Sequence, residues 1–192
     1  QWSFAAVILA LWWWQRRTPA ALALAWPAGP FAPWLVGLAA VGVLAIVLQA
    51  RAIARNPKAL AAIRRKLSHV ERMLPHAPGE MSWFRALSLT AGVCEELMFR
   101  GFLMGYLGHY LPWWGAVVLS SLAFGFGHSY QGLRGIVQTG VVGAVMAVPV
   151  LLARSLAIPM VLHAATDLYA GHLGQLALQS KPAGADEELE KS

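Results

Sequence analysis

The chain has 192 residues, of which 58% are hydrophobic and only 12% are charged. These fractions lie outside the range of soluble globular domains and predict a membrane protein. The formal net charge of +6 would in a soluble protein suggest nucleic-acid binding. Seven of the fifteen basic residues, however, lie between Arg51 and Arg72, directly after an apolar run. We therefore expect contact with an anionic lipid surface and no nucleic-acid partner.

The N-terminal part of the chain contains two apolar runs and a basic connector. Residues 2–14 predict a short first helix, and we expect the N-terminus to be trimmed. Residues 31–50 give the clearest spanning helix, because such a helix needs about 20 mostly apolar residues. Residues 51–80 are basic, with apolar residues at roughly helical intervals. This pattern predicts an amphipathic helix on the membrane surface or, equally well, a solvated connecting helix.

Four further apolar runs follow. The third predicted span covers about 81–108, and the fourth begins after Pro112, which suits a helix start. The fifth span, about 132–153, is rich in small residues at intervals of four, which allow helices to approach closely. The sixth covers about 156–178. The residues after it are polar, and we expect a disordered tail.

These runs predict an all-α fold, a polytopic transmembrane bundle of about six spans. We divide it into N-terminal spans with the basic connector (1–80), a helical core (81–178) and the polar tail (179–192). The basic excess in 51–72 predicts that this segment and the C-terminus are cytoplasmic. Arg16 and Arg17, in the loop after the first helix, argue against this orientation. We expect an integral membrane protein, in the inner membrane of a bacterium.

Three charges interrupt the third span, within the stretch AGVCEELMFRGF at 91–102. An ionisable residue near the bilayer centre costs roughly 2.5–3.5 kcal/mol on insertion scales, so each one needs a partner or a wet cavity. Glu96 and Arg100 are four positions apart, which predicts an ion pair on one face of the helix. Glu95 lies about 100° around the helix from Glu96. We expect its carboxylate to be available for another role.

Polar groups also occur in the fourth and sixth spans. His128 closes the run FGFGH that begins at Phe124, while His163 and Asp167 are four positions apart and share a helix face. If the three helices converge, Glu95, His128, His163 and Asp167 form one buried polar site, supported by Glu96, Arg100 and Phe124. Each feature also has a simpler interpretation, because an intramembrane histidine or an ion pair often serves packing alone.

The three ordered motifs resemble those of one known family. E-E-x-x-x-R at 95–100, F-x-x-x-H at 124–128 and H-x-x-x-D at 163–167 are similar to the motifs of the CPBP intramembrane endopeptidases. That family includes the type II CAAX prenyl proteases and the Abi or bacteriocin-processing proteins. The resemblance covers about 81–178. It implies hydrolysis of a peptide bond in a membrane-embedded or lipid-anchored substrate.

The resemblance also implies a role for each matching residue. Glu95 would be the general base on a water that His128 helps to position, while His163 and the residue four later would stabilise the oxyanion. Many family members have asparagine at that last position, where this chain has Asp167. An ionised aspartate cannot donate a hydrogen bond. Asp167 would therefore be protonated, orient His163 or bind a metal.

Two mechanisms follow from these residues. Glu95, His128, His163 and Asp167 supply nitrogen and oxygen ligands that zinc accepts, whereas a glutamate-dependent mechanism needs no cofactor. We favour the metal-free mechanism because the chain has no H-E-x-x-H pair, the helical zinc-binding pattern.

Other functional classes fit less well. A transporter or ion-conducting subunit would also contain buried acids and histidines, but it would typically show an inverted repeat, which we do not find. A serine nucleophile at Ser129 lacks the second glycine of a G-x-S-x-G turn, because Gln131 stands at that position. A non-catalytic scaffold that keeps the motifs stays open as a third class.

Overall fold

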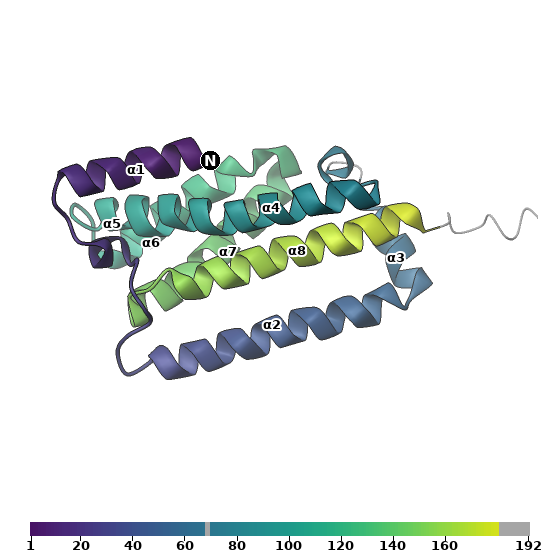
Figure 1. Cartoon of the computed structure of the whole chain (residues 1–192), viewed down its shortest axis with the longest axis horizontal. Helices are drawn as coiled ribbons and strands as arrows, with labels where there is room; N and C mark the ends of the chain where they lie inside the picture. Colours follow the sequence, from purple (N-terminus) through teal and green to yellow (C-terminus); the bar gives the residue numbers. More distant parts are fainter. Residues whose placement is uncertain (68–69, 181–192) are drawn as a thin grey trace, which may run out of the picture.

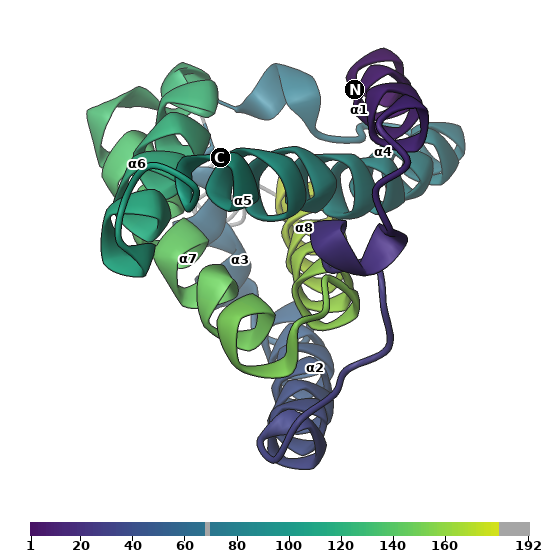
Figure 2. The ribbon, with the colours of Figure 1, turned by 90° about the vertical axis from the view of Figure 1, so that its left-hand side faces the viewer.

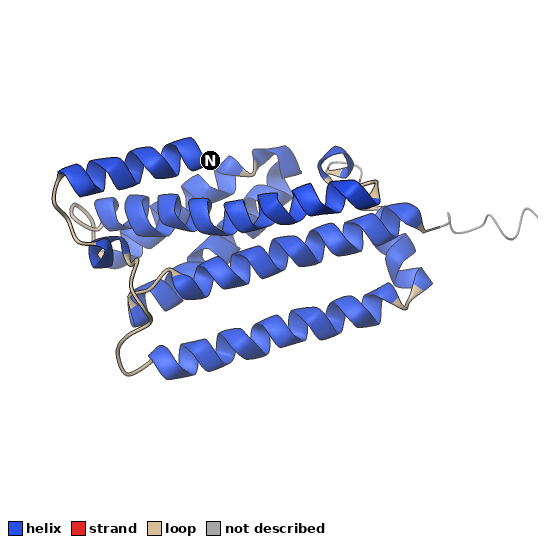
Figure 3. Ribbon diagram, viewed as in Figure 1, coloured by secondary structure: helices blue, strands red, loops and turns tan. Residues whose placement is uncertain are grey.

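The structure is a computed structural model that describes residues 1–67 and 70–180. Within these residues the chain forms helices joined by loops, with no strand (Figure 3). The predicted all-α class is confirmed. The polar tail predicted at 179–192 lies, from residue 181 onward, outside the described residues.

Helix α8 (Ala157–Gln179) lies at the centre of the packing. It packs against α4 (Pro78–Glu96) on one side and against α2 (Ala32–Ala54) on another, and the three long helices run side by side (Figure 1). Helix α1 (Trp2–Trp14) lies along α4. This arrangement brings the C-terminal end of α4, with Glu95 and Glu96, next to His163 of α8.

Helices α6 (Trp113–Gly127) and α7 (Gly132–Ala153) form a closely packed pair. Helix α6 lies beside residues 97–107, which continue α4, and α7 packs against α8 (Figure 2). Their close approach depends on glycine, because a Cβ atom added at Gly125 would lie 2.5 Å from the carbonyl oxygen of Ile136. Helix α6 begins directly after Pro112, as predicted. The loop between α6 and α7 starts at His128, so this histidine lies at a helix end beside the core.

The third predicted span is one continuous helical rod with an irregular middle. Helix α4 passes into a π-helix, Leu97–Leu103, and then into the short α5, Met104–Leu107. π-helical turns are rare and occur frequently at functional sites. The sequence pattern did not predict this segment, which begins directly after the paired glutamates.

The single amphipathic helix predicted over 51–80 is wrong. Helix α2 continues to Ala54, and a separate helix α3 covers Pro57–Arg64. Among the described residues between α3 and α4, the only further helical element is a 3₁₀ turn, Glu71–Met73. Asn56 explains the break, because its backbone is extended and its side-chain oxygen accepts a hydrogen bond from the Ala59 amide. Pro57 then starts the new helix, where a missing N–H costs nothing.

Within residues 1–67 and 70–180, two helical stretches are long and apolar enough to cross a membrane, namely α2 and residues 129–153. The helices α1 and α6 are apolar but shorter. Helices α4 and α8 are not among these stretches, because they contain several polar and charged residues, those of the site among them. The predicted number of six spans is therefore not confirmed.

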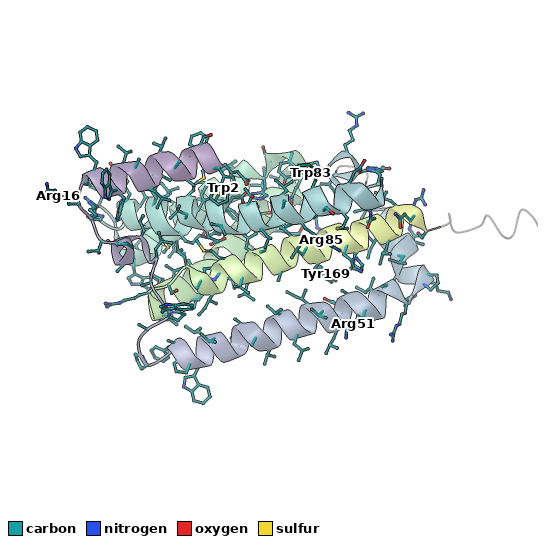
Figure 4. All side chains as sticks on the ribbon, viewed as in Figure 1. Trp2, Arg16, Arg51, Trp83, Arg85 and Tyr169 are labelled. Carbon is teal, nitrogen blue, oxygen red and sulfur yellow. The ribbon has the colours of Figure 1, made fainter. Side chains whose placement is uncertain are left out.

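The exposed surface of these helices is strongly apolar. In the most apolar 18-residue stretch of α2, no residue is buried. Helix α7 carries an exposed stripe formed by Val137, Val141, Val145 and Val148. Arg16 and Arg51 lie toward opposite ends of the bundle (Figure 4). This distribution, apolar along the helices and charged toward their ends, is the one that a lipid bilayer favours.

Candidate active site

Glu96 forms the predicted ion pair with Arg100. The Glu96 carboxylate is fully buried, and its Oε1 atom accepts a hydrogen bond from Arg100 Nη1 over 3.0 Å. The guanidinium lies over the Phe124 ring, 4.0 Å from its centroid. Gly143 of α7 leaves room for it, because a Cβ atom there would lie 2.7 Å from Arg100 Nη2. The charged pair is thus enclosed by α6 and α7.

Glu96 has a second partner that the sequence did not predict. His163 of α8 lies with its Nδ1 atom 2.8 Å from the same Glu96 Oε1 atom. A carboxylate only accepts, so Nδ1 of His163 carries a proton and donates it to this bond. Glu96 therefore fixes both the orientation of the imidazole and the position of its proton. The contact joins residues 67 positions apart, and no local pattern indicates it.

Glu95 points to the other side, toward two imidazoles. Its Oε2 atom lies 3.7 Å from His128 Nε2 and 3.9 Å from His163 Nε2. Within the described residues this buried oxygen has no hydrogen-bond partner. Both distances exceed a direct hydrogen bond and match those that a single water bridges.

The other oxygen of Glu95 contacts the first residue of the sequence. Glu95 Oε1 accepts a hydrogen bond of 2.6 Å from the side-chain amide of Gln1. This contact was not predicted, because nothing in the sequence places the start of α1 beside the third span. It fixes one carboxylate oxygen and leaves Oε2 directed at the histidines.

His128 is oriented by its own helix. Its Nδ1 atom lies 2.9 Å from the carbonyl oxygen of Phe124. A carbonyl oxygen only accepts, so Nδ1 again carries a proton and Nε2 faces Glu95. The Phe124 ring packs against both imidazoles, with centroid distances of 4.7 Å to His128 and 5.8 Å to His163. Phe124 thus holds the two rings as well as the guanidinium.

Asp167 lies at the open edge of the cluster. Its Oδ2 atom is 3.7 Å from His163 Nε2, and its side chain is 37% exposed. This separation is too long for a direct hydrogen bond. Since Glu96 already binds the other nitrogen, direct orientation of His163 by Asp167 is not observed. The structure nevertheless brings all seven predicted residues into one cluster.

A cavity of about 630 Å³ adjoins this cluster. Its walls are largely apolar, and Glu95, His128 and Asp167 lie along it. The apolar lining includes side chains from α1, the segment before α4, α4 itself and the π-helix: Phe4, Leu74, Phe84, Leu87 and Met98. The cavity is therefore suited to an apolar or lipid-linked chain that must reach the carboxylate.

The same residues fit a metal ion poorly as they stand. Tetrahedral zinc ligands about 2.0 Å from the metal lie about 3.3 Å from one another, whereas Glu95 Oε2 is 3.7 and 3.9 Å from the two nitrogens. Across residues 1–67 and 70–180, no group of three or more His, Cys, Asp or Glu side chains has an arrangement that would hold a metal.

The fold and the cluster together describe a class of protein: a helical protein with an apolar surface and a buried carboxylate that faces two imidazoles. Comparison with protein families then identifies it further, because residues 77–169 match the family described as "Type II CAAX prenyl endopeptidase Rce1-like". This match, over residues 77–169, agrees with the family that the three motifs predicted. The family consists of membrane-integral proteases.

All four predicted catalytic residues lie within the matched segment. Neither the curated proteins nor the solved structures give a match.

We predict that replacing Arg100 with methionine will destabilise the protein by about 3–5 kcal/mol, because it leaves the buried Glu96 without its cation. Thermal unfolding in detergent measures the effect. Arg134→Met on α7 is the matched control, since Arg134 is exposed and its loss should change little. Equal unfolding temperatures for the two variants would contradict the assigned role of the ion pair.

Proposed function

We propose that the chain is an intramembrane endopeptidase that hydrolyses a peptide bond of a membrane-associated protein or peptide. The observation that supports this best is the position of Glu95 Oε2, unpartnered among the described residues and facing the Nε2 atoms of two histidines. The family match of residues 77–169 gives the class of reaction. The geometry supports the individual roles that follow.

In this proposal Glu95 and His128 together hold the attacking water. A water about 2.8 Å from both Glu95 Oε2 and His128 Nε2 would span their 3.7 Å separation. It donates one hydrogen to each, since His128 carries its own proton on Nδ1 and its Nε2 accepts. The water oxygen keeps a lone pair for the substrate carbonyl. Glu95 acts as the general base.

His163 then stabilises the charge that develops on the carbonyl oxygen. As the water oxygen bonds to the carbonyl carbon, Glu95 takes a proton and the carbonyl oxygen becomes an oxyanion. A protonated His163 donates from Nε2 to this oxyanion, and Glu96 at Nδ1 stabilises the imidazolium. When the C–N bond breaks, the proton on Glu95 passes to the leaving amine, so the products are a carboxylic acid and an amine.

Asp167 contributes through its charge in this scheme. Its carboxylate, 3.7 Å from His163 Nε2, favours the protonated imidazole without competing for Nδ1. An asparagine at this position would instead donate a hydrogen bond itself. The aspartate of this chain thus assigns the donor role to His163 alone.

The substrate class follows from the cavity and the family. Proteases of the CAAX type act on membrane-anchored prenylated substrates, and the apolar cavity beside Glu95 is suited to a membrane-embedded or lipid-anchored peptide. We place the catalytic core at residues 81–178 and the N-terminal spans with the basic connector at 1–80.

We also propose a bundle of about six membrane segments in a bacterial inner membrane, with residues 51–72 and the C-terminus in the cytoplasm. The basic residues of this segment lie at one end of the bundle, as the positive-inside rule requires.

An impermeant amine reagent should modify Lys58 only from the cytoplasmic side of sealed membrane vesicles. Modification from the opposite side alone would reverse the orientation.

We predict that Glu95→Gln will reduce cleavage of a membrane-tethered peptide by at least about 100-fold, because the amide cannot accept the proton of the water. Cleavage in liposomes by the purified protein is the measurement. Glu80→Gln is the matched control, since Glu80 is an exposed glutamate on the same helix and should retain full activity. Equal cleavage by Glu95→Gln and wild type would rule out the proposed mechanism.

The metal-free mechanism predicts that a strong chelator leaves cleavage unchanged. The reason is that water activation is assigned to Glu95 and oxyanion stabilisation to His163. The assay compares the protein before and after prolonged dialysis against the chelator. Loss of activity that returns with added zinc would instead assign the same residues to a metal.

A further inference from the structure

A second, smaller cavity of about 200 Å³ reaches the catalytic cluster from the side of α7 and α8. It shares His128, Gln131 and Asp167 with the larger cavity, and it also includes Glu96 and His163 in its walls. The two cavities therefore meet at the same reactive groups. We call this smaller cavity the α7–α8 crevice.

The walls of the crevice differ in chemistry from those of the larger cavity. Beyond the catalytic cluster they include three polar side chains on facing helices, namely Gln138 and Thr139 of α7 and Thr166 of α8. Polar side chains in membrane helices are costly unless they face the bundle interior or water. The Thr166 hydroxyl donates a hydrogen bond of 2.7 Å to the Leu162 carbonyl oxygen of its own helix. Neither Gln138 nor Thr139 is required by the proposed chemistry, so their position needs another explanation.

Helix α7 separates a lipid-facing stripe from a crevice stripe. Val137, Val141 and Val145 are 58%, 61% and 61% exposed and form one stripe. A second stripe lies one position further along the chain. Its members Gln138, Val142 and Met146 are also four residues apart, and all three line the crevice. Gln138 is also exposed and Val142 is 45% exposed, so this stripe reaches the molecular surface too. It differs from the valine stripe in carrying a polar side chain.

We propose that the α7–α8 crevice is the route by which water reaches Glu95 and the histidines. This inference rests on the proposed hydrolytic function, in which every turnover consumes one water. A peptide held in the larger apolar cavity would block supply from that side. At about 30 Å³ per molecule, the crevice has room for roughly six waters, enough for a continuous file to the cluster.

Cysteine labelling tests the route without requiring activity. The thiolate reacts with a small anionic methanethiosulfonate reagent only where water ionises it. Cys94 is the single cysteine of the chain and is fully buried, so the wild-type protein measures the background. Two pairs of neighbours are compared in liposomes: Gln138→Cys with Val137→Cys, and Val142→Cys with Val141→Cys. Each pair lies within about 1.5 Å along the helix axis.

We expect the crevice member of each pair to react at least about tenfold faster than its lipid-facing neighbour. Equal rates within both pairs would overturn the proposal. Reaction of the crevice cysteines with a membrane-soluble maleimide alone would likewise overturn it, by showing that the crevice is filled with lipid.

A kinetic measurement then tests the link to hydrolysis. The double variant Gln138→Met/Thr139→Val keeps side-chain size and removes polarity. It should lower kcat about tenfold with KM unchanged, because the peptide binds in the other cavity. Val137→Leu on the lipid-facing stripe should leave both constants unchanged. If the crevice cysteines react with the reagent but kcat of the double variant is unchanged, the proposed role of the crevice in water supply would be overturned.

An inactive wild-type protein would instead refute the proposed hydrolytic function and leave the labelling result standing.

Discussion

The arrangement of the site depends on one carboxylate oxygen, Glu96 Oε1, which Arg100 and His163 share. A buried charge is tolerated only with a partner, and removal of one partner of a buried pair is far more costly than the pair is stabilising. Arg100 on the same rod and His163 on α8 therefore position each other through Glu96. The Phe124 ring and the absence of a side chain at Gly143 give the guanidinium its place. One interaction thus links α4, α6, α7 and α8.

The neighbouring glutamate acquires its different role from this constraint. Because Glu96 is fixed toward Arg100 and α8, Glu95 must point about 100° away along the helix surface. That direction leads to the end of α6, where the Phe124 carbonyl orients His128. Two adjacent residues of the same type thus become a buried structural group and an available base. The difference arises from the helix geometry, because the two side chains are chemically identical.

The sequence predicted those features that depend on local spacing. Patterns within a few residues predicted where two helices begin, after Pro112 and at 132. They also predicted the Glu96–Arg100 pair and the family, and all of these predictions were confirmed. The contacts Glu96–His163 and Gln1–Glu95 depend on how whole helices rotate and slide against one another, which no short pattern encodes. The break at Asn56 was missed because apolar periodicity continued across it. The number of spans stays a prediction, because polar and charged residues, those of the site among them, lower the apolar content of α4 and α8.

The π-helix at Leu97–Leu103 has a consequence for how this segment can vary in length. A π-turn holds more residues than the α-turn it replaces, so it shifts the angular phase between α4 and α5. Deletion of one residue there would restore regular winding and rotate one end of the rod by about 100° relative to the other. Chain length in this stretch therefore sets the rotational alignment of the two rod ends, independently of which side chains it contains.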